Sequence, residues 1–166
     1  MRAFVSPGQG AQTIGMGRAL AEAYPAARAV FDEVDEALGE NLSGLIWDGD
    51  IETLTLTRNA QPALMATSIA AMRALEAEGF AITDAAYVAG HSLGEYSALC
   101  AAGAISLSDT ARLLKLRGQA MQRAVPVGQG AMASLIGPKT DLALAEAAAA
   151  AGSAGRARRG RRRPGR

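Results

Sequence analysis

The sequence predicts an α/β protein with a largely parallel sheet. Short apolar runs alternate with longer segments of helical periodicity, as in proteins whose parallel strands are joined by helices. Two of these runs lead into glycine-rich stretches, "SPGQG" and "GHSLG", which are typical of tight turns after strands. Because 49% of the 166 residues are hydrophobic, the chain can form a substantial core.

The first half of the chain predicts one strand followed by helices. In "PAARAVFDEVDEAL" apolar residues recur at helical spacing with acidic residues opposite, and Pro25 is tolerated in a first helical turn. Gly39 ends this helix. The expected elements are a strand over 3–5, helices over 15–24, 25–38 and 41–47, a connection over 49–57, and a long helix over 61–78.

The second half predicts a strand that leads directly into a helix. Ser106 and Asp109 have the spacing of a capping box before the next periodic segment. The expected elements are a buried strand over 85–89, a helix from Leu93 to a stop at Gly103, a helix from about Leu107 to Arg123, a strand over 130–137 and a last helix over 140–152.

Cysteine content and hydropathy place the chain in the cytoplasm. The single cysteine, Cys100, cannot form an internal disulfide, which fits a reducing compartment. The N-terminus carries no basic segment before a long apolar run, and no apolar stretch is long enough to span a bilayer. We therefore expect a soluble cytoplasmic protein with no membrane association.

The net charge of +1 combines two different regions. Residues 156–166 hold 7 of the 17 basic residues and no acid, leaving 10 basic against 16 acidic residues elsewhere. Such a segment is compatible with binding to nucleic acid or an anionic surface. It has no aromatic residue to stack on a base and no periodicity, so we expect a disordered end that binds no nucleic acid.

A candidate nucleophile lies in Gly90-His91-Ser92-Leu93-Gly94. A tight turn between strand and helix would expose the Ser92 hydroxyl, and the N–H groups that follow it would stabilise an oxyanion. The alternative is an ordinary turn. The neighbouring His91 is the only histidine, and side chains adjacent on an extended segment point to opposite faces, so we do not expect it to serve Ser92 as a base.

Two further places are candidates for chemistry. The loop Ser6 to Gln12 has neither the third glycine of a dinucleotide fingerprint, since Thr13 stands there, nor a P-loop lysine, so no nucleotide cofactor is expected. Gln9 in this loop is either a second oxyanion donor or part of a plain turn. Arg117 falls within the apolar arc of its helix, where a guanidinium needs an anion, either a substrate carboxylate or an internal acid.

Five stretches together resemble the malonyl-CoA:acyl carrier protein transacylase family and its relatives, the acyltransferase domains of polyketide synthases. They match in order and with the family's spacing, over about Met1 to Ala150. They are "PGQGAQ", "TRNAQPAL", "GHSLGEYSA", "LKLRGQAM" and "GQGAMASLIG".

The resemblance implies an S-malonyltransferase of fatty acid biosynthesis. Ser92 would be the catalytic nucleophile that carries malonyl from malonyl-CoA to the phosphopantetheine thiol of acyl carrier protein. The N–H groups of Gln9 and Leu93 would form the oxyanion hole, and Arg117 would bind the malonyl carboxylate. Leucine after the serine, where methylmalonyl-selecting relatives have glutamine, favours malonyl. No metal and no cofactor are implied.

The family also implies a domain division. Residues 1–125 would be the N-terminal part of an α/β-hydrolase-like main subdomain, 126–150 the start of a small ferredoxin-like subdomain, and 151–166 the basic end. Family members continue further, and their second half carries the histidine base. We therefore expect a truncated or frameshifted member that is incomplete at its C-terminus, has apolar faces left uncovered and lacks full activity alone.

Two other functions stay open on the sequence. One is a serine hydrolase of the α/β type, such as a thioesterase, although Arg117 and the "PGQGAQ" loop argue against it. The other is a catalytically inactive module that binds acyl carrier protein or, through its basic end, an anionic partner.

Overall fold

The computed structural model describes residues 1–125 and Glu146. The chain divides into two compact units, Met1–Val127 and Gly128–Arg166. In the second unit only Glu146 is described, as an exposed helical residue. The expected strand over 130–137 and the basic end over 151–166 lie outside the described residues, and so does the helix over 140–152 apart from Glu146.

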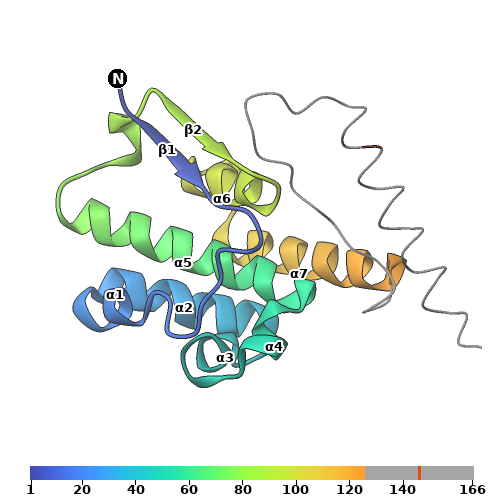
Figure 1. Cartoon of the computed structure of the whole chain (residues 1–166). Helices are drawn as coiled ribbons and strands as arrows, with labels where there is room; N and C mark the ends of the chain where they lie inside the picture. Colours follow the sequence, from blue (N-terminus) through green and yellow to red (C-terminus); the bar gives the residue numbers. More distant parts are fainter. Residues whose placement is uncertain (126–145, 147–166) are drawn as a thin grey trace, which may run out of the picture. The chain divides into compact units, whose positions relative to one another are not determined.

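The sheet in the first unit has two parallel strands. β1 (Ala3–Ser6) pairs with β2 (Tyr87–Gly90) in a register that sets Ala3 opposite Tyr87 and Ser6 opposite Gly90. The chain between them forms a long helical crossover, which is what a parallel pair requires (Figure 1). The described part is thus a mixed α/β structure with a parallel sheet, as the sequence predicted.

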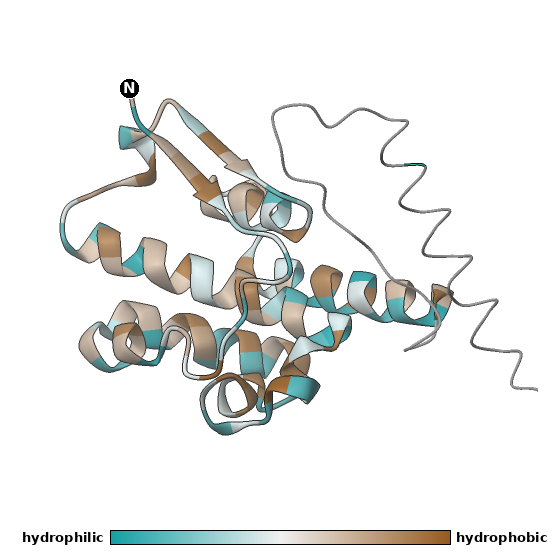
Figure 2. Cartoon of the chain, viewed as in Figure 1, coloured by the Kyte–Doolittle hydropathy of each residue, from teal (hydrophilic) through white to brown (hydrophobic). Residues whose placement is uncertain are grey.

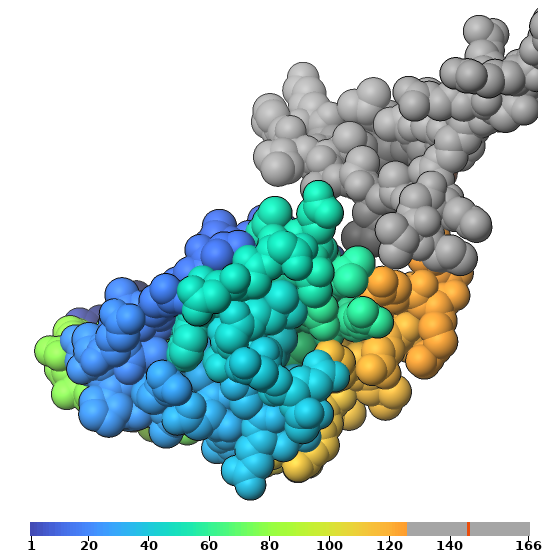
Figure 3. Space-filling view, turned by 90° about the horizontal axis from the view of Figure 1, so that it is seen from below, coloured from blue at the N-terminus to red at the C-terminus, as the bar shows by residue number. Residues whose placement is uncertain are grey.

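The helices pack around one central helix, α5. It lies against α2, α6 and α7, and α6 also packs on both strands. From below, α1 to α4 form the blue-to-teal surface with α7 in orange at one edge (Figure 3). The bounds are α1 (Arg18–Ala23), α2 (Pro25–Leu38), α3 (Leu42–Asp48), α4 (Ile51–Thr55), α5 (Thr57–Ala77), a 3₁₀ turn η1 (Ile82–Asp84), α6 (Leu93–Ala101) and α7 (Leu107–Ala124).

Small side chains let α5 sit at the centre of this packing. Ala60, Ala63, Ala66 and Ala70 are fully buried along it. Because alanine projects little beyond the backbone, neighbouring helices can approach closely.

In the part of the chain that the structure describes, no helix is long and apolar enough to cross a membrane.

Helix α2 follows its sequence signals at both ends. Pro25 occupies the first turn, and Gly39 ends the helix with φ +62°. The N–H of Gly39 donates to Glu36 O and the N–H of Glu40 to Asp35 O, the two bonds of a Schellman motif. The buried side chains are those of the predicted apolar face: Ala27, Val30, Phe31 and Val34.

Two expectations about residues 49–61 are wrong. The predicted connection contains the short helix α4, which Asp50 caps by accepting from the Thr53 N–H at 2.7 Å. Helix α5 then begins at Thr57 and not at Gln61, with Pro62 inside it. Burial offsets the lost hydrogen bond, because Asn59, Gln61 and Pro62 all lie among the buried residues of α5.

Candidate active site

Ser92 occupies a strained turn between β2 and α6. Its backbone has φ +55° and ψ −112°, and it is the one non-glycine residue with positive φ among those described. A Cβ on Gly90 would lie 1.9 Å from the backbone of Gly94, and a Cβ on Gly94 would lie 2.4 Å from Ser6 O. Both glycines of the motif are therefore required by close backbone contacts.

The turn presents Ser92 at the start of α6. The Ser92 side chain is exposed, whereas Leu93 is buried and anchors the first turn of the helix in the core. As the first residue of α6, Leu93 has no acceptor for its N–H within the helix. This geometry leaves an N–H beside the serine, at the positive end of the helix dipole.

Arg117 reaches this serine from α7. Its Nη2 donates to Ser92 Oγ at 3.1 Å, and its Nη1 donates to Gln61 Oε1 at 2.7 Å. The guanidinium also lies over the Tyr96 ring, 5.8 Å from the centroid. Among the described residues no acid forms an ion pair with Arg117, so the internal salt bridge that the sequence left open is not found there.

Gln9 lies in the loop after β1, beside the serine turn. Its Nε2 donates to Thr57 Oγ1 at 3.2 Å, which ties the loop to the start of α5. The loop also contacts the turn directly, because Ser6 O accepts from the His91 N–H at 3.2 Å. The structure thus brings Ser92, Leu93 and Arg117 together, with the Gln9 loop alongside.

His91 faces the loop. A Cβ on Gly8 would lie 2.3 Å from His91 Nδ1, so the ring fills the space that the glycine leaves. Within the described residues, the hydrogen bond recorded for Ser92 Oγ comes from Arg117 and not from His91. This placement agrees with a histidine that shapes the turn and does not act as its base.

The sequence did not identify Gln61 as a residue of the site. Gln61 lies in the "TRNAQPAL" stretch, and the signal that could have identified it is a polar side chain between alanine and proline in a buried helix. On α7, Lys115 is also buried, where it pairs with Glu40 and donates to Asn59 Oδ1 at 3.2 Å. Met121, near the end of the same helix, is 39% exposed.

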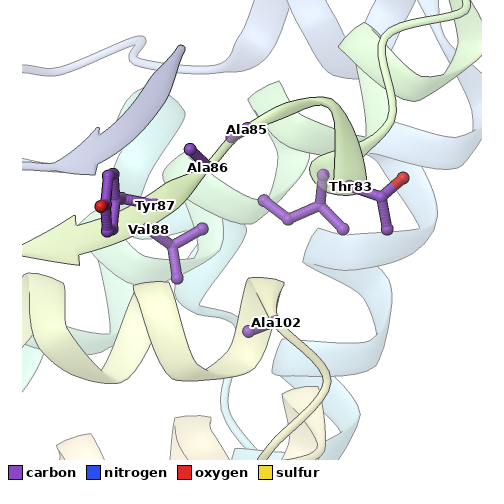
Figure 4. Close-up of a pocket in the computed structure, with 7 residues that line it drawn as sticks. Thr83, Ala85, Ala86, Tyr87, Val88 and Ala102 are labelled. Atoms are coloured by element: carbon purple, nitrogen blue, oxygen red, sulfur yellow. The ribbon is translucent and has the colours of Figure 1, made fainter. Parts of the chain in front are cut away.

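A separate pocket of about 240 Å³, open to the surface, lies at the other end of β2 (Figure 4). Its walls are mostly aliphatic and come from the segment before β2, from β2 and from the end of α6 at Ala102. It contains none of the four predicted site residues.

The described part of the chain also holds no cluster of three His, Cys, Asp or Glu side chains able to bind a metal ion.

Comparison with known proteins gives a consistent family match. The model of the acyl transferase domain family matches residues 3–153. The malonyl CoA-acyl carrier protein transacylase of Bacillus subtilis (strain 168) is 56% identical over 135 residues, which is 81% of this chain and 42% of that protein. The crystal structure of acyl-carrier-protein S-malonyltransferase from Bartonella henselae matches with TM-score 0.81 and 58% identity, over 89% of this chain and 47% of that one.

A second similar structure is a malonyl-transacylase in complex with its type II PKS acyl-carrier protein. It matches with TM-score 0.70 and 45% identity, over 75% of this chain and 40% of that one. This chain therefore spans less than half the length of these relatives.

Proposed function

The chain belongs to the acyl transferase domain family, and from this premise we propose that its function is S-malonyl transfer from malonyl-CoA to acyl carrier protein. The observation that carries the proposal is the 3.1 Å contact between Arg117 Nη2 and Ser92 Oγ on the strained turn. In a malonyl ester only the carbonyl and methylene carbons separate Oγ from the carboxylate. An arginine that reaches Oγ is therefore also close enough to pair with that carboxylate.

The proposed reaction has two steps. Ser92 Oγ attacks the thioester carbonyl carbon, its proton passes to a base, and the carbon–sulfur bond breaks to release CoA as its thiol. The phosphopantetheine thiol of acyl carrier protein then attacks the ester, takes the malonyl group and restores the serine. The N–H groups of Leu93 and Gln9 are the proposed donors to the oxyanion, for which the start of α6 is favourably placed.

Removal of the Ser92 hydroxyl proton needs a base, and we identify none among the described residues. Arg117, the hydrogen-bond partner of Ser92 Oγ described above, is a permanent cation and accepts no proton. General base catalysis typically contributes about 10²–10⁴-fold to a rate. If no residue outside the described part supplies a base, acylation of Ser92 is expected to be slower by about that factor.

The surrounding assignments are part of the same proposal. Residues 1–125 form the N-terminal part of an α/β-hydrolase-like main subdomain, whereas the ferredoxin-like subdomain expected to begin over 126–150 lies outside the described residues apart from Glu146. The protein acts in the cytoplasm with acyl carrier protein as acceptor. The similarity to a malonyl-transacylase solved with its acyl-carrier protein supports this choice of partner.

Labelling with malonyl-CoA tests the proposal. After incubation, intact mass and peptide mapping should place one malonyl group on Ser92, and Ser92→Ala should remove it. Ser97→Ala is the matched control, because Ser97 lies on the same helix but is 1% exposed. A label on Ser97 or Cys100 that persists in Ser92→Ala would refute the nucleophile assignment.

A further inference from the structure

The Arg117 guanidinium is held by an amide buried in the core. Gln61 is 1% exposed, and its Oε1 accepts from Arg117 Nη1 at 2.7 Å. The other end of the same amide is also occupied, because Nε2 donates to Met121 Sδ at 3.3 Å. With both ends engaged, the amide presents its oxygen and not its nitrogen to the arginine.

Close packing of α7 on α5 places the two side chains together. A Cβ on Gly118 would lie 2.6 Å from Arg58 Cα and from Thr57 O, so the α7 backbone touches the first turn of α5 next to Arg117. Gln61 lies one turn further along α5. The rigid contact between the helices thus determines how far the arginine must extend to meet the amide.

The neutrality of this partner distinguishes Arg117 from Arg112 and Lys115 on the same helix. Arg112 forms an ion pair with Asp109, and Lys115 forms one with Glu40. Arg117 is bound instead by an amide, which accepts a hydrogen bond without cancelling the positive charge. The charge beside Ser92 is therefore left for an anion from outside the described residues.

We propose that Gln61 is a specificity-determining positioning residue. It directs the guanidinium towards Ser92 Oγ and, because it carries no charge, keeps Arg117 available to an acyl group that ends in a carboxylate. A glutamate of the same size at this position would hold the arginine equally well but would neutralise it. The inference rests on the proposed function, since it concerns how that site selects malonyl over uncharged acyl groups.

The test measures binding of malonyl-CoA and acetyl-CoA by calorimetry, using the 166-residue chain with Ser92→Ala so that no acylation consumes the ligand. We expect the parent to prefer malonyl-CoA and Arg117→Ala to lose that preference. Gln61→Glu should weaken malonyl-CoA binding by about tenfold or more, the scale of a lost partly buried charge interaction, and leave acetyl-CoA nearly unchanged.

Gln61→Met separates charge from position and guards against a glutamate variant that does not fold. Methionine fills similar space without charge, so it should reduce the malonyl preference less than glutamate does. The reduction should still be measurable, because the guanidinium loses the hydrogen bond to Gln61 Oε1 that positions it. Equal loss in Gln61→Met and Gln61→Glu, or an unchanged preference in Gln61→Met, overturns the inference. If the parent shows no malonyl preference, or Arg117→Ala retains it, the proposed function itself fails.

Discussion

Among single residues, Ser92 has a strained backbone, and Arg117 has a charge that pairs with no acid among the described residues. A positive φ at a serine is unfavourable, and it persists because Gly90 and Gly94 allow the turn to close against the β1 loop. Arg117 then extends from another helix to the same hydroxyl. The strained turn and the Arg117 charge are thus side by side at the Ser92 hydroxyl, which suits the proposed nucleophile for an anionic substrate.

Replacing Arg117 by lysine should reduce malonyl labelling of Ser92 far more than acetyl labelling. Lysine keeps the charge, but it has no planar fork with which to bind Gln61 and a carboxylate at the same time. Because Arg117 is only half-buried, we expect the preference for malonyl over acetyl to fall by about 2 kcal/mol. This is the lower end of the range for a desolvated pair. The measurement is the ratio of the two labelling rates from intact mass.

Arg112→Lys is the control for that experiment. Arg112 lies on the same helix, is exposed and pairs with Asp109, so its replacement should leave the ratio unchanged. If Arg117→Lys slows both labels to the same degree, the arginine has a structural role and does not select the acyl group.

The predictability of the site differs from residue to residue for a physical reason. The serine turn is specified by neighbours in sequence, since glycines on both sides and the strand and helix around it are local features. Arg117 was identified by its position in an apolar arc and by resemblance. Its partner Gln61 is 56 residues away along the chain, and that contact depends on helix packing that no local pattern encodes.

Among the elements, those with strong local signals were predicted best. Helix α2 has a proline start, an apolar face and a glycine end, and α7 has Ser106 as its N-cap, accepting from the Asp109 N–H at 3.1 Å. Helix α4 was missed because it is only five residues long. The burial of Lys115 could not be predicted, because it depends on Glu40, which is 75 residues distant.

The contact between α5 and α7 gives a prediction about Gly118. An alanine there would favour the helix locally by about 1 kcal/mol. Its Cβ would nonetheless lie 2.6 Å from backbone atoms of α5, which cannot move aside as a flexible side chain would. We therefore expect Gly118→Ala to lower the free energy of unfolding by about 1–3 kcal/mol in urea denaturation.

Gln119→Ala tests whether that loss comes from the contact and not from any change in α7. Gln119 is half-buried and adjacent, and its replacement should stay within about 0.5 kcal/mol of the parent. If Gly118→Ala is as stable as the parent, then α5 and α7 lie further apart than the 2.6 Å distance from a Gly118 Cβ to the α5 backbone implies.

In the described unit as a whole, the core is helical and the sheet is open on one face. Four apolar residues point away from α6 on the paired strands and are exposed: Ala3, Val5, Tyr87 and Ala89. Figure 2 shows hydrophobic residues in brown on both strands. Two strands are marginal as an independent sheet, so the packing of α2, α5, α6 and α7 must supply most of the stability.

A stable helical core beside an exposed sheet face predicts different losses of stability for the same substitution at two valines. Val34 on α2 is 1% exposed, whereas Val5 on β1 is 72% exposed. Threonine has nearly the shape of valine, so Val→Thr mainly places a hydroxyl where a methyl was. In the core that hydroxyl loses its water, and Val34→Thr should lower the free energy of unfolding by about 1–3 kcal/mol. At Val5 it stays hydrated, and threonine is also a good strand former, so the change should be within about 0.5 kcal/mol.

Urea denaturation of both variants measures the two losses of stability. If Val5→Thr costs as much as Val34→Thr, then the outer face of the sheet is covered in the folded protein, and the stability is shared between the sheet and the helices.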